Sequence, residues 1–187
     1  MTTAITGGIG SGKSFVCRLL EKRGINNIYD CDKAAKRLIK EDPKIKEELL
    51  RTIGQHAYEN GKLNKAAVAE FLMESEANKR RINAIVHPAV ASDFLKSGHK
   101  WMECAILYES GFDKLVDRVV AVSAPRETRI ERIMARDNID RHKAEEWIDL
   151  QLPQEEVERK ADFVIINDGL RDLDEQLSLI IGKFRQI

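Results

Sequence analysis

Residues 7–14 (GGIGSGKS) have the residue types and the spacing of a phosphate-binding loop. They match the pattern G-x-x-x-x-G-K-[ST] at every fixed position. The glycines leave room for successive backbone N–H groups to converge on phosphate oxygens, at the positive end of the helix that follows. Lys13 can place a cation on the β- and γ-phosphates, and the Ser14 hydroxyl can bind the Mg²⁺ that bridges them. This stretch therefore indicates binding of nucleotide phosphates.

The flanking sequence supplies the strand and the helix that such a loop joins. Residues 2–6 are prone to form a strand, and residues 15–20 place apolar side chains at helical spacing. The alternative is a glycine-rich turn that matches the pattern by chance, and such a turn need not lie between a strand and a helix. We therefore interpret residues 7–14 as a functional phosphate site.

A second candidate for chemistry is the carboxylate pair Asp30 and Asp32, which follows a predicted strand over residues 25–29. The carboxyl ends of parallel strands meet at one edge of a sheet, so both side chains can face the phosphate loop. Asp32 also suits the N-cap of the helix predicted to begin near residue 33. We favour a functional role for Asp32 and keep the helix cap as the alternative.

Composition limits the class of protein. The 187 residues suit one α/β domain with small insertions. Lys and Arg total 31, as do Asp and Glu, so the zero net charge predicts no nucleic-acid or membrane partner. The three cysteines are scattered, and no apolar run approaches the roughly 20 residues of a membrane span. We expect a cytoplasmic protein, monomeric or weakly homo-oligomeric, that acts on small molecules.

Residues 41–100 are predicted to form a helical insertion without a strand, because apolar side chains recur at helical spacing among charged ones. Gly61 is expected to separate two helices. The basic tract 79–81 could attract an anionic substrate, but we favour a solvated helical face. Pro88 disfavours the α conformation at His87, so we expect a helix break with His87 facing a cleft; alone, such a histidine is more often structural.

The sheet is expected to continue with strands over residues 101–107, 119–122 and 163–166, with Glu109 following the first of them. Alternation of strands and helices indicates βαβ units, whose right-handed crossovers bring the carboxyl ends of the strands to one edge. The predicted fold is a three-layer, doubly wound parallel α/β sheet. An amphipathic helix over residues 170–184 closes it.

A helix predicted to begin after Pro125 carries four arginines at three- and four-residue spacing, namely Arg126, Arg129, Arg132 and Arg136. Salt bridges with Glu127 and Glu131 would explain them structurally. A guanidinium also matches the spread negative charge of a phosphoryl-transfer transition state, so we favour phosphate contact by at least one of them. The charged hairpin that follows, residues 139–157, could close over a nucleotide.

The motifs, in their order along the chain, resemble those of the dephospho-CoA kinases over almost the full sequence. They are TGGIGSGKS at 6–14, DCD at 30–32, GKL at 61–63, IVHP at 85–88, LYE at 107–109, RIMARD at 132–137, Gln151 and residues 162–169. The resemblance implies a P-loop NTPase fold like that of the nucleoside-monophosphate kinases. It also implies transfer of the ATP γ-phosphoryl group to the 3′-hydroxyl of dephospho-CoA, the last step of coenzyme A synthesis, with Mg²⁺. The chain lacks the N-K-x-D and D-x-x-G tracts of regulatory GTPases.

The resemblance also implies a division of the chain and roles for single residues. The core would comprise residues 1–32, 101–136 and 158–187, with an acceptor insertion at about 33–100 and a lid at about 137–157. Asp32 matches the aspartate that accepts or orients the 3′-hydroxyl proton, and Lys13 and Arg136 would stabilise the transferred phosphate. Acceptor binding is assigned to Asp32, Lys36, His87 and Glu109, and Mg²⁺ binding to Ser14. Nucleotide binding is assigned to Gly8, Ile9, Gly10, Ser11, Gly12, Lys13, Ser14, Phe15 and Asn167, with Asn167 near adenine.

Some positions depart from the family pattern. Glu103 and Ala105 stand where D-I-P-L-L-F-E has aspartate and proline, which leaves the surroundings of Mg²⁺ open. Lys36 stands where many members have arginine. Lysine keeps the positive charge but cannot make the two parallel hydrogen bonds of a guanidinium. Phe15 replaces threonine, and Trp147 stands where some members have a lid arginine.

Two other functions stay open at this level. A kinase for another nucleotide or nucleoside would use the same framework, because acceptor choice depends on residues 33–100. A regulatory protein with a silent site would bind ATP without acceptor-dependent release of ADP; intact Lys13, Ser14 and Asp32 argue against it.

Overall fold

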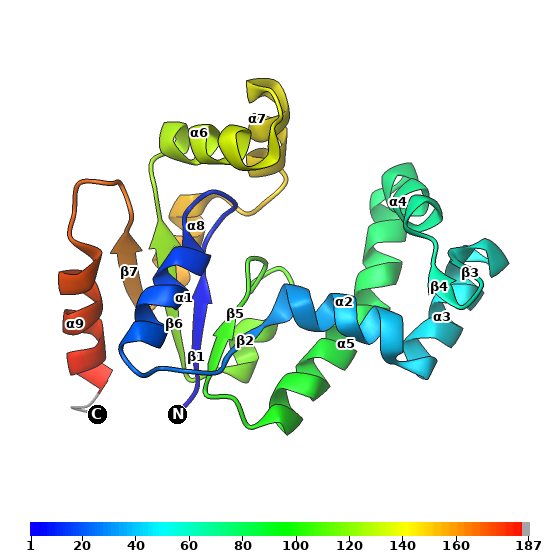
Figure 1. The fold of residues 1–187 in the computed structure, drawn as a ribbon, viewed down its shortest axis with the longest axis horizontal. Coiled ribbons are helices and arrows are strands. Elements are labelled where there is room, and N and C mark those ends of the chain that lie inside the picture. Colours follow the sequence, from blue (N-terminus) through cyan, green and yellow to red (C-terminus); the bar gives the residue numbers. More distant parts are fainter. Residues whose placement is uncertain (185–187) are drawn as a thin grey trace. The chain divides into compact units, whose positions relative to one another are not determined.

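The computed structural model describes residues 1–184 and contains a central five-stranded sheet (Figure 1). The strand order is β2-β5-β1-β6-β7, and β1 pairs in parallel with β5 and β6, as β6 does with β7. The strands are β1 (Thr3–Thr6), β2 (Ile28–Asp30), β5 (Trp101–Glu103), β6 (Arg118–Ser123) and β7 (Phe163–Ile166). The predicted parallel α/β sheet flanked by helices is confirmed.

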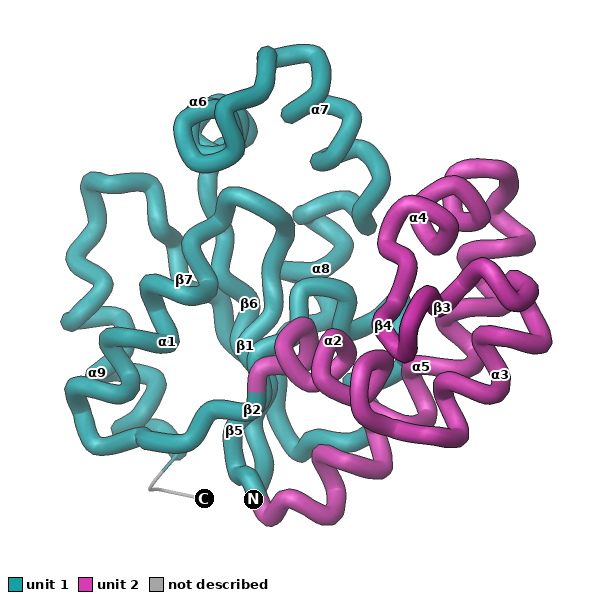
Figure 2. The backbone as a smooth tube through the Cα atoms, turned by 45° about the vertical axis from the view of Figure 1, so that its right-hand side comes forward, with its two compact units in different colours: residues 1–29, 99–187 teal, residues 30–98 magenta. Residues whose placement is uncertain are grey.

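The chain divides into two compact units, residues 1–29 with 99–187 and residues 30–98 (Figure 2). Within residues 1–184, the first unit contains the sheet and the α-helices α1 (Lys13–Lys22), α6 (Arg126–Asp137), α7 (Arg141–Asp149), α8 (Gln154–Lys160) and α9 (Leu173–Phe184). All six residues of β6 are buried, which explains its nearly continuous apolar sequence. Val16 and Leu20 of α1 pack in one core with Leu177 of α9 and with Ile5, Val120 and Ile165 of the sheet. This core holds the start of α1, and therefore the phosphate loop, against the strands.

The second unit is built from α2 (Cys31–Glu41), α3 (Pro43–Ile53), α4 (Lys65–Glu74) and α5 (Glu76–Ser97). Helix α5 packs against each of the other three. Its buried apolar residues recur every four positions, at Ile82, Val86, Val90 and Phe94. This spacing gives one continuous apolar stripe from Ile82 to Phe94.

A short hairpin in the second unit corrects the prediction that residues 41–100 lack strands. β3 (Tyr58–Glu59) pairs antiparallel with β4 (Lys62–Leu63). Asn60 and Gly61 connect them with φ values of 50° and 77°. Asn-Gly is the preferred pair for a two-residue hairpin turn with positive φ at both positions. Gly61 therefore closes a hairpin rather than simply separating two helices.

The expected helix break at His87 is also wrong, because α5 continues through Pro88. Proline removes one backbone hydrogen bond and crowds the preceding turn. The apolar stripe of α5 buries Val86 and Val90 on either side of this position. Tertiary packing of an amphipathic face supplies most helix stability in proteins and here outweighs the local cost.

Several element boundaries differ from those predicted. The strand predicted over residues 25–29 is Ile28–Asp30, and the helix predicted to begin near residue 33 begins at Cys31. The strand expected over residues 101–107 ends at Glu103, and the chain then turns, with Ser110 N–H donating to the Ile106 carbonyl at 2.9 Å. The carboxylate at the end of this strand is therefore Glu103, not Glu109. Helix α9 begins at Leu173 rather than at residue 170, because the Asp172 carboxylate accepts the backbone N–H groups of the first turn.

In the part of the chain that the structure describes, no helix is both long enough and apolar enough to cross a membrane.

Candidate active site

The phosphate loop connects β1 to α1, as predicted. Gly12 precedes the helix with φ of 94° and ψ of 25°, a left-handed conformation that L side chains rarely adopt. Its carbonyl accepts the N–H groups of Phe15 and Val16 at 3.0 and 3.1 Å. The sharp change of direction at Gly12 begins the helix at Lys13, whose N-terminal dipole favours an anion.

Two side chains at the start of α1 carry the groups expected to meet ATP and Mg²⁺. Lys13 Nζ donates to the carbonyl oxygens of Gly7 and Gly8 at 2.7 and 3.2 Å, so the ammonium lies over the first half of the loop. Ser14 Oγ donates to Glu103 Oε1 at 2.9 Å. Burial raises the pKa of the Cys17 thiol, and the negative charge of Glu103 and a hydrogen bond to it add to the shift. Glu103 thus contacts Ser14 in the first turn of α1 and Cys17 in the second.

Ser14 and Glu103 form an oxygen pair that fits a Mg²⁺ site. Mg²⁺ prefers hard oxygen ligands and usually takes only one or two from the protein, with the rest from phosphates and water. Within residues 1–184 there is no cluster of three His, Cys, Asp or Glu side chains that could hold a metal. The present residues suit a Mg²⁺ that arrives with nucleotide.

The second half of the loop is held by Asn167 and Arg132. Asn167 is 7% exposed, and its Nδ2 donates to the Ser11 carbonyl at 2.8 Å. Arg132 donates to the Asn167 carbonyl at 3.1 Å, with longer contacts of 3.4 Å to the carbonyls of Gly10 and Ser11. The Asn167 side chain therefore binds the backbone of the phosphate loop, and its predicted position near adenine stays a prediction. Arg132 is the arginine of the predicted RIMARD tract that reaches the loop.

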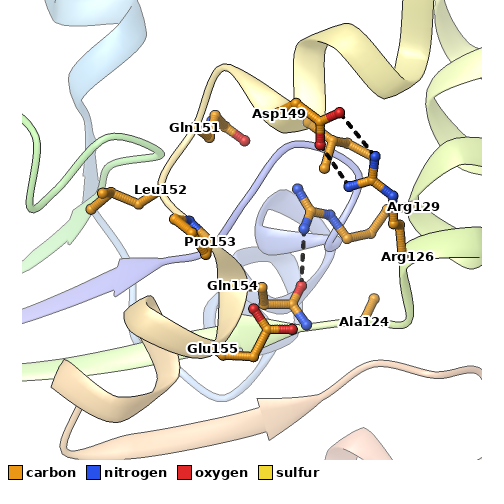
Figure 3. Close-up of a pocket in the computed structure, with 10 residues that line it drawn as sticks. Ala124, Arg126, Arg129, Asp149, Gln151, Leu152, Pro153, Gln154 and Glu155 are labelled. Carbon is orange, nitrogen blue, oxygen red and sulfur yellow. Dashed lines mark hydrogen bonds and ion pairs between the residues drawn. The ribbon is translucent and has the colours of Figure 1, made fainter. Parts of the chain in front are cut away.

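The first half of the loop is held at Ile9 by Arg129 of α6 and by Gln151 of the segment that joins α7 to α8. Figure 3 labels both of these side chains. Arg129 Nε donates to the Ile9 carbonyl at 2.8 Å, and the Ile9 N–H donates to Gln151 Oε1 at 2.7 Å. Sequence reasoning gave Arg129 no specific role. The sequence feature that could have indicated one is its position on the helix beside the apolar residues Ile130 and Ile133. Arg129, Ile130 and Ile133 form the buried face of α6.

Arg136, predicted to contact the transferred phosphate, lies elsewhere on α6. Its side chain is 58% exposed and pairs with Asp137 through contacts of 2.6 to 3.1 Å. Glu109 is exposed and accepts the Leu152 N–H at 3.3 Å. The roles of Arg136 and Glu109 stay predictions.

The remaining predicted acceptor residues belong to the second unit. Asp30 caps α2, because its carboxylate accepts the Lys33 N–H at 2.9 Å. The alternative role of Asp32 as that cap is therefore wrong, and Asp32 lies exposed in the first helical turn, one turn before Lys36. His87 is half-buried in α5, and burial lowers its pKa, which favours the neutral imidazole. The roles of Asp32, Lys36 and His87 stay predictions.

Comparison with known proteins places this geometry in a family. A family model described as dephospho-CoA kinase matches residues 1–172. The chain belongs to the dephospho-CoA kinase family. A dephospho-CoA kinase of Bacteroides fragilis is 42% identical over 185 residues, which cover 95% of this chain and 90% of that protein. One from Fusobacterium nucleatum is 36% identical over 181 residues, covering 92% and 93% of the two chains.

Solved structures share the fold of this chain. A Thermus thermophilus protein superposes with a TM-score of 0.84 at 28% identity and covers 98% of this chain and 97% of its own. The Campylobacter jejuni dephospho-CoA kinase has a TM-score of 0.68 at 22% identity, with 98% and 96% coverage. A shikimate kinase from Acinetobacter baumannii, at 0.55 and 18% identity with 99% and 92% coverage, shares the fold.

Glu103, which departs from the aspartate common in dephospho-CoA kinases, gives a direct test of the metal site. Replacing it with alanine removes the acceptor of the Ser14 hydroxyl. Loss of a group that orients a metal ligand typically costs about 10- to 100-fold in metal affinity. We therefore expect Glu103→Ala to raise the Mg²⁺ concentration for half-maximal rate by about that factor. A Mg²⁺ titration of turnover measures this, with Glu21→Gln on the exposed side of α1 as control. An unchanged Mg²⁺ requirement in Glu103→Ala would show that Glu103 takes no part in the predicted binding of Mg²⁺.

Proposed function

We propose that this protein transfers the γ-phosphoryl group of ATP to the 3′-hydroxyl of dephospho-CoA, giving ADP and coenzyme A. The observation that carries the proposal is the family match over residues 1–172 in a chain whose phosphate loop keeps its lysine and serine. The contacts of Lys13 and Ser14 at the start of α1 support it. Phosphoryl transfer needs positioning and charge stabilisation more than covalent chemistry, and this loop supplies both.

Each part of the reaction has a proposed residue. The backbone N–H groups of the loop and Lys13 bind the ATP phosphates, and an arginine of α6 stabilises the charge that spreads over the transferred group. Asp32 accepts a hydrogen bond from the 3′-hydroxyl and orients its oxygen for in-line attack. Lys36, His87 and Glu109 bind the acceptor.

Mg²⁺ is part of the proposal. Ser14 would bind it, and Glu103 would orient the Ser14 hydroxyl or share the ion. When bound, Mg²⁺ neutralises negative charge on the β- and γ-phosphate oxygens. The protein's own contribution is to hold the oxygen donors at the end of β5 and the start of α1.

We also propose a cytoplasmic protein, monomeric or weakly homo-oligomeric, with small-molecule substrates. Cys17, Cys31 and Cys104 are buried thiols, which suits a reducing compartment.

Paired variants distinguish the two candidate phosphate arginines, Arg132 and Arg136. Arg132 already reaches the loop carbonyls, so Arg132→Met is expected to raise the KM for ATP by about 10- to 100-fold, the value of one or two charged hydrogen bonds. Arg136→Met is expected to lower kcat with little change in KM, because its predicted contact forms in the transition state. Steady-state kinetics with varied ATP measures both. An unchanged kcat in Arg136→Met would show that its predicted role is wrong.

Release of ADP with and without dephospho-CoA tests the proposed function. We expect turnover to require dephospho-CoA. Coenzyme A is the matched control, since its 3′-hydroxyl is already phosphorylated and should support no turnover. Equal or greater stimulation by adenosine, deoxyadenosine or shikimate would identify another acceptor class. ATP binding without stimulation by any of them would indicate a silent nucleotide site.

A further inference from the structure

The peptide between Ile9 and Gly10 is fixed by a side chain that the proposed reaction does not use. Arg129 Nε donates to the Ile9 carbonyl at 2.8 Å. A trans peptide is planar, and its N–H points opposite to its C=O. The bond from Arg129 therefore turns the Gly10 N–H away from α6. Arg129, a residue outside the loop, thus sets the direction of the Gly10 N–H.

The guanidinium is itself oriented by a chain of hydrogen bonds that ends at Glu158 of α8. Figure 3 shows the first of these bonds, between Arg129 and Gln154. Arg129 donates to Gln154 Oε1 at 3.2 Å, Gln154 Nε2 donates to Ser123 Oγ at 2.7 Å, and Ser123 Oγ donates to Glu158 at 2.6 Å. The Ser123 hydroxyl gives its only proton to Glu158, so it must accept from Gln154. This fixes the amide oxygen of Gln154 toward Arg129.

Burial and close packing hold the guanidinium against the loop. Arg129 is 4% exposed, and a Cβ atom at Gly8 would lie 2.2 Å from its terminal nitrogen. Its hydrogen-bond partners, the Ile9 carbonyl and the Gln154 amide, are both neutral. Burial, with the positive charge of Arg126, lowers the pKa of Arg129, and the negative charges of Glu155 and Asp149 offset part of this shift. Burying a cation against neutral hydrogen-bond acceptors costs free energy, and a phosphate anion that approaches the loop offsets part of that cost.

We propose that Arg129 is a positioning residue for phosphate binding. It fixes the Ile9–Gly10 peptide so that the Gly10 N–H can serve a phosphate, and it adds positive charge behind the first half of the loop. The inference rests on the proposed use of ATP but not on the identity of the acceptor. Arg126 provides a matched control, because it lines the same cavity of about 240 Å³ from the same helix, yet is half-exposed and pairs with Asp149.

Calorimetric binding of ATP and of adenosine, without any acceptor, tests the proposal. We expect Arg129→Met to lower the ratio of ATP to adenosine affinity by about 10- to 100-fold. Arg129→Lys, which keeps the charge and one donor, should recover part of that loss. Arg126→Met should leave the ratio unchanged. A merely structural defect would weaken both ligands together, so an unchanged ratio in Arg129→Met would overturn the proposal, as would an equal loss in Arg126→Met.

A second variant covers the case in which Arg129→Met does not fold. Gln154→Leu keeps Arg129 and removes the acceptor that orients it. The same ratio should fall by a smaller factor, and an unchanged ratio would overturn the role of the hydrogen-bonded chain. Failure of the proposed function would appear separately, as ATP binding with no dephospho-CoA-dependent turnover in the parent protein.

Discussion

Gly12→Ala is expected to weaken ATP binding by about 100-fold. At φ of 94° an L residue is strained by roughly 1–2 kcal/mol. The added Cβ would lie 2.1 Å from Asn167 Nδ2, so Asn167 must move and lose its bond to Ser11, which costs about a further 1 kcal/mol. Both energies are relieved when the loop leaves its phosphate-binding conformation, so ATP binding must supply them. Each 1.4 kcal/mol lowers the affinity for ATP about tenfold. Titration calorimetry with ATP measures the change.

Gly24→Ala is the matched control for this prediction. Gly24 has a similar φ of 83°, but no heavy atom lies within 4 Å of the position of an added Cβ. It therefore carries the backbone strain without the clash and lies outside the phosphate loop. We expect ATP affinity close to that of the parent. Equal weakening in both variants would show that general destabilisation, and not contact with Asn167, is the cause.

Asp32→Asn is expected to lower kcat by about 10²- to 10⁴-fold, the usual contribution of a group that takes or orients a proton in the transition state. Asparagine keeps the size of the side chain but loses the charge that accepts the 3′-hydroxyl proton. The KM for ATP should change little, because the predicted role concerns the acceptor. Single-turnover measurements with saturating ATP and dephospho-CoA separate this chemical step from product release.

Asp30→Asn tests the assignment between the two carboxylates. Asp30 caps α2 and pairs with the exposed Lys33 at 3.0 Å. Asparagine caps helices about as well as aspartate, and an exposed ion pair contributes at most about 1 kcal/mol. We expect nearly normal kcat for Asp30→Asn. A collapse of kcat in this variant, with Asp32→Asn active, would move the proposed base to Asp30.

Local sequence predicted the elements whose conformation depends on nearby residues. The phosphate loop, its strand and helix, and the fully buried β6 are of this kind, because glycine spacing and apolar periodicity act over a few residues. The Asn60-Gly61 hairpin was within reach of the same reasoning, since that pair is a strong turn signal. The predicted break between two helices rests on Gly61 alone and leaves out the asparagine before it.

Other features depend on contacts between segments distant in sequence. Helix α5 passes through Pro88 because packing along its apolar stripe outweighs a local penalty. Asn167 lies 156 positions from Ser11, and Arg129 lies 120 from Ile9, so their support of the loop is a product of the sheet topology. Periodicity alone could place Arg129 on the inner face of α6 but could not identify the carbonyl that it meets.

The central claim is phosphorylation of one hydroxyl of one acceptor, and the structure of the product tests it most directly. Mass spectrometry and ³¹P NMR of the product formed from ATP and dephospho-CoA would identify the new phosphate ester. We predict a single product with a 3′-phosphate, coenzyme A, in equal amount to the ADP released. Release of ADP with unmodified dephospho-CoA, or a phosphate on another oxygen, would contradict the proposed function.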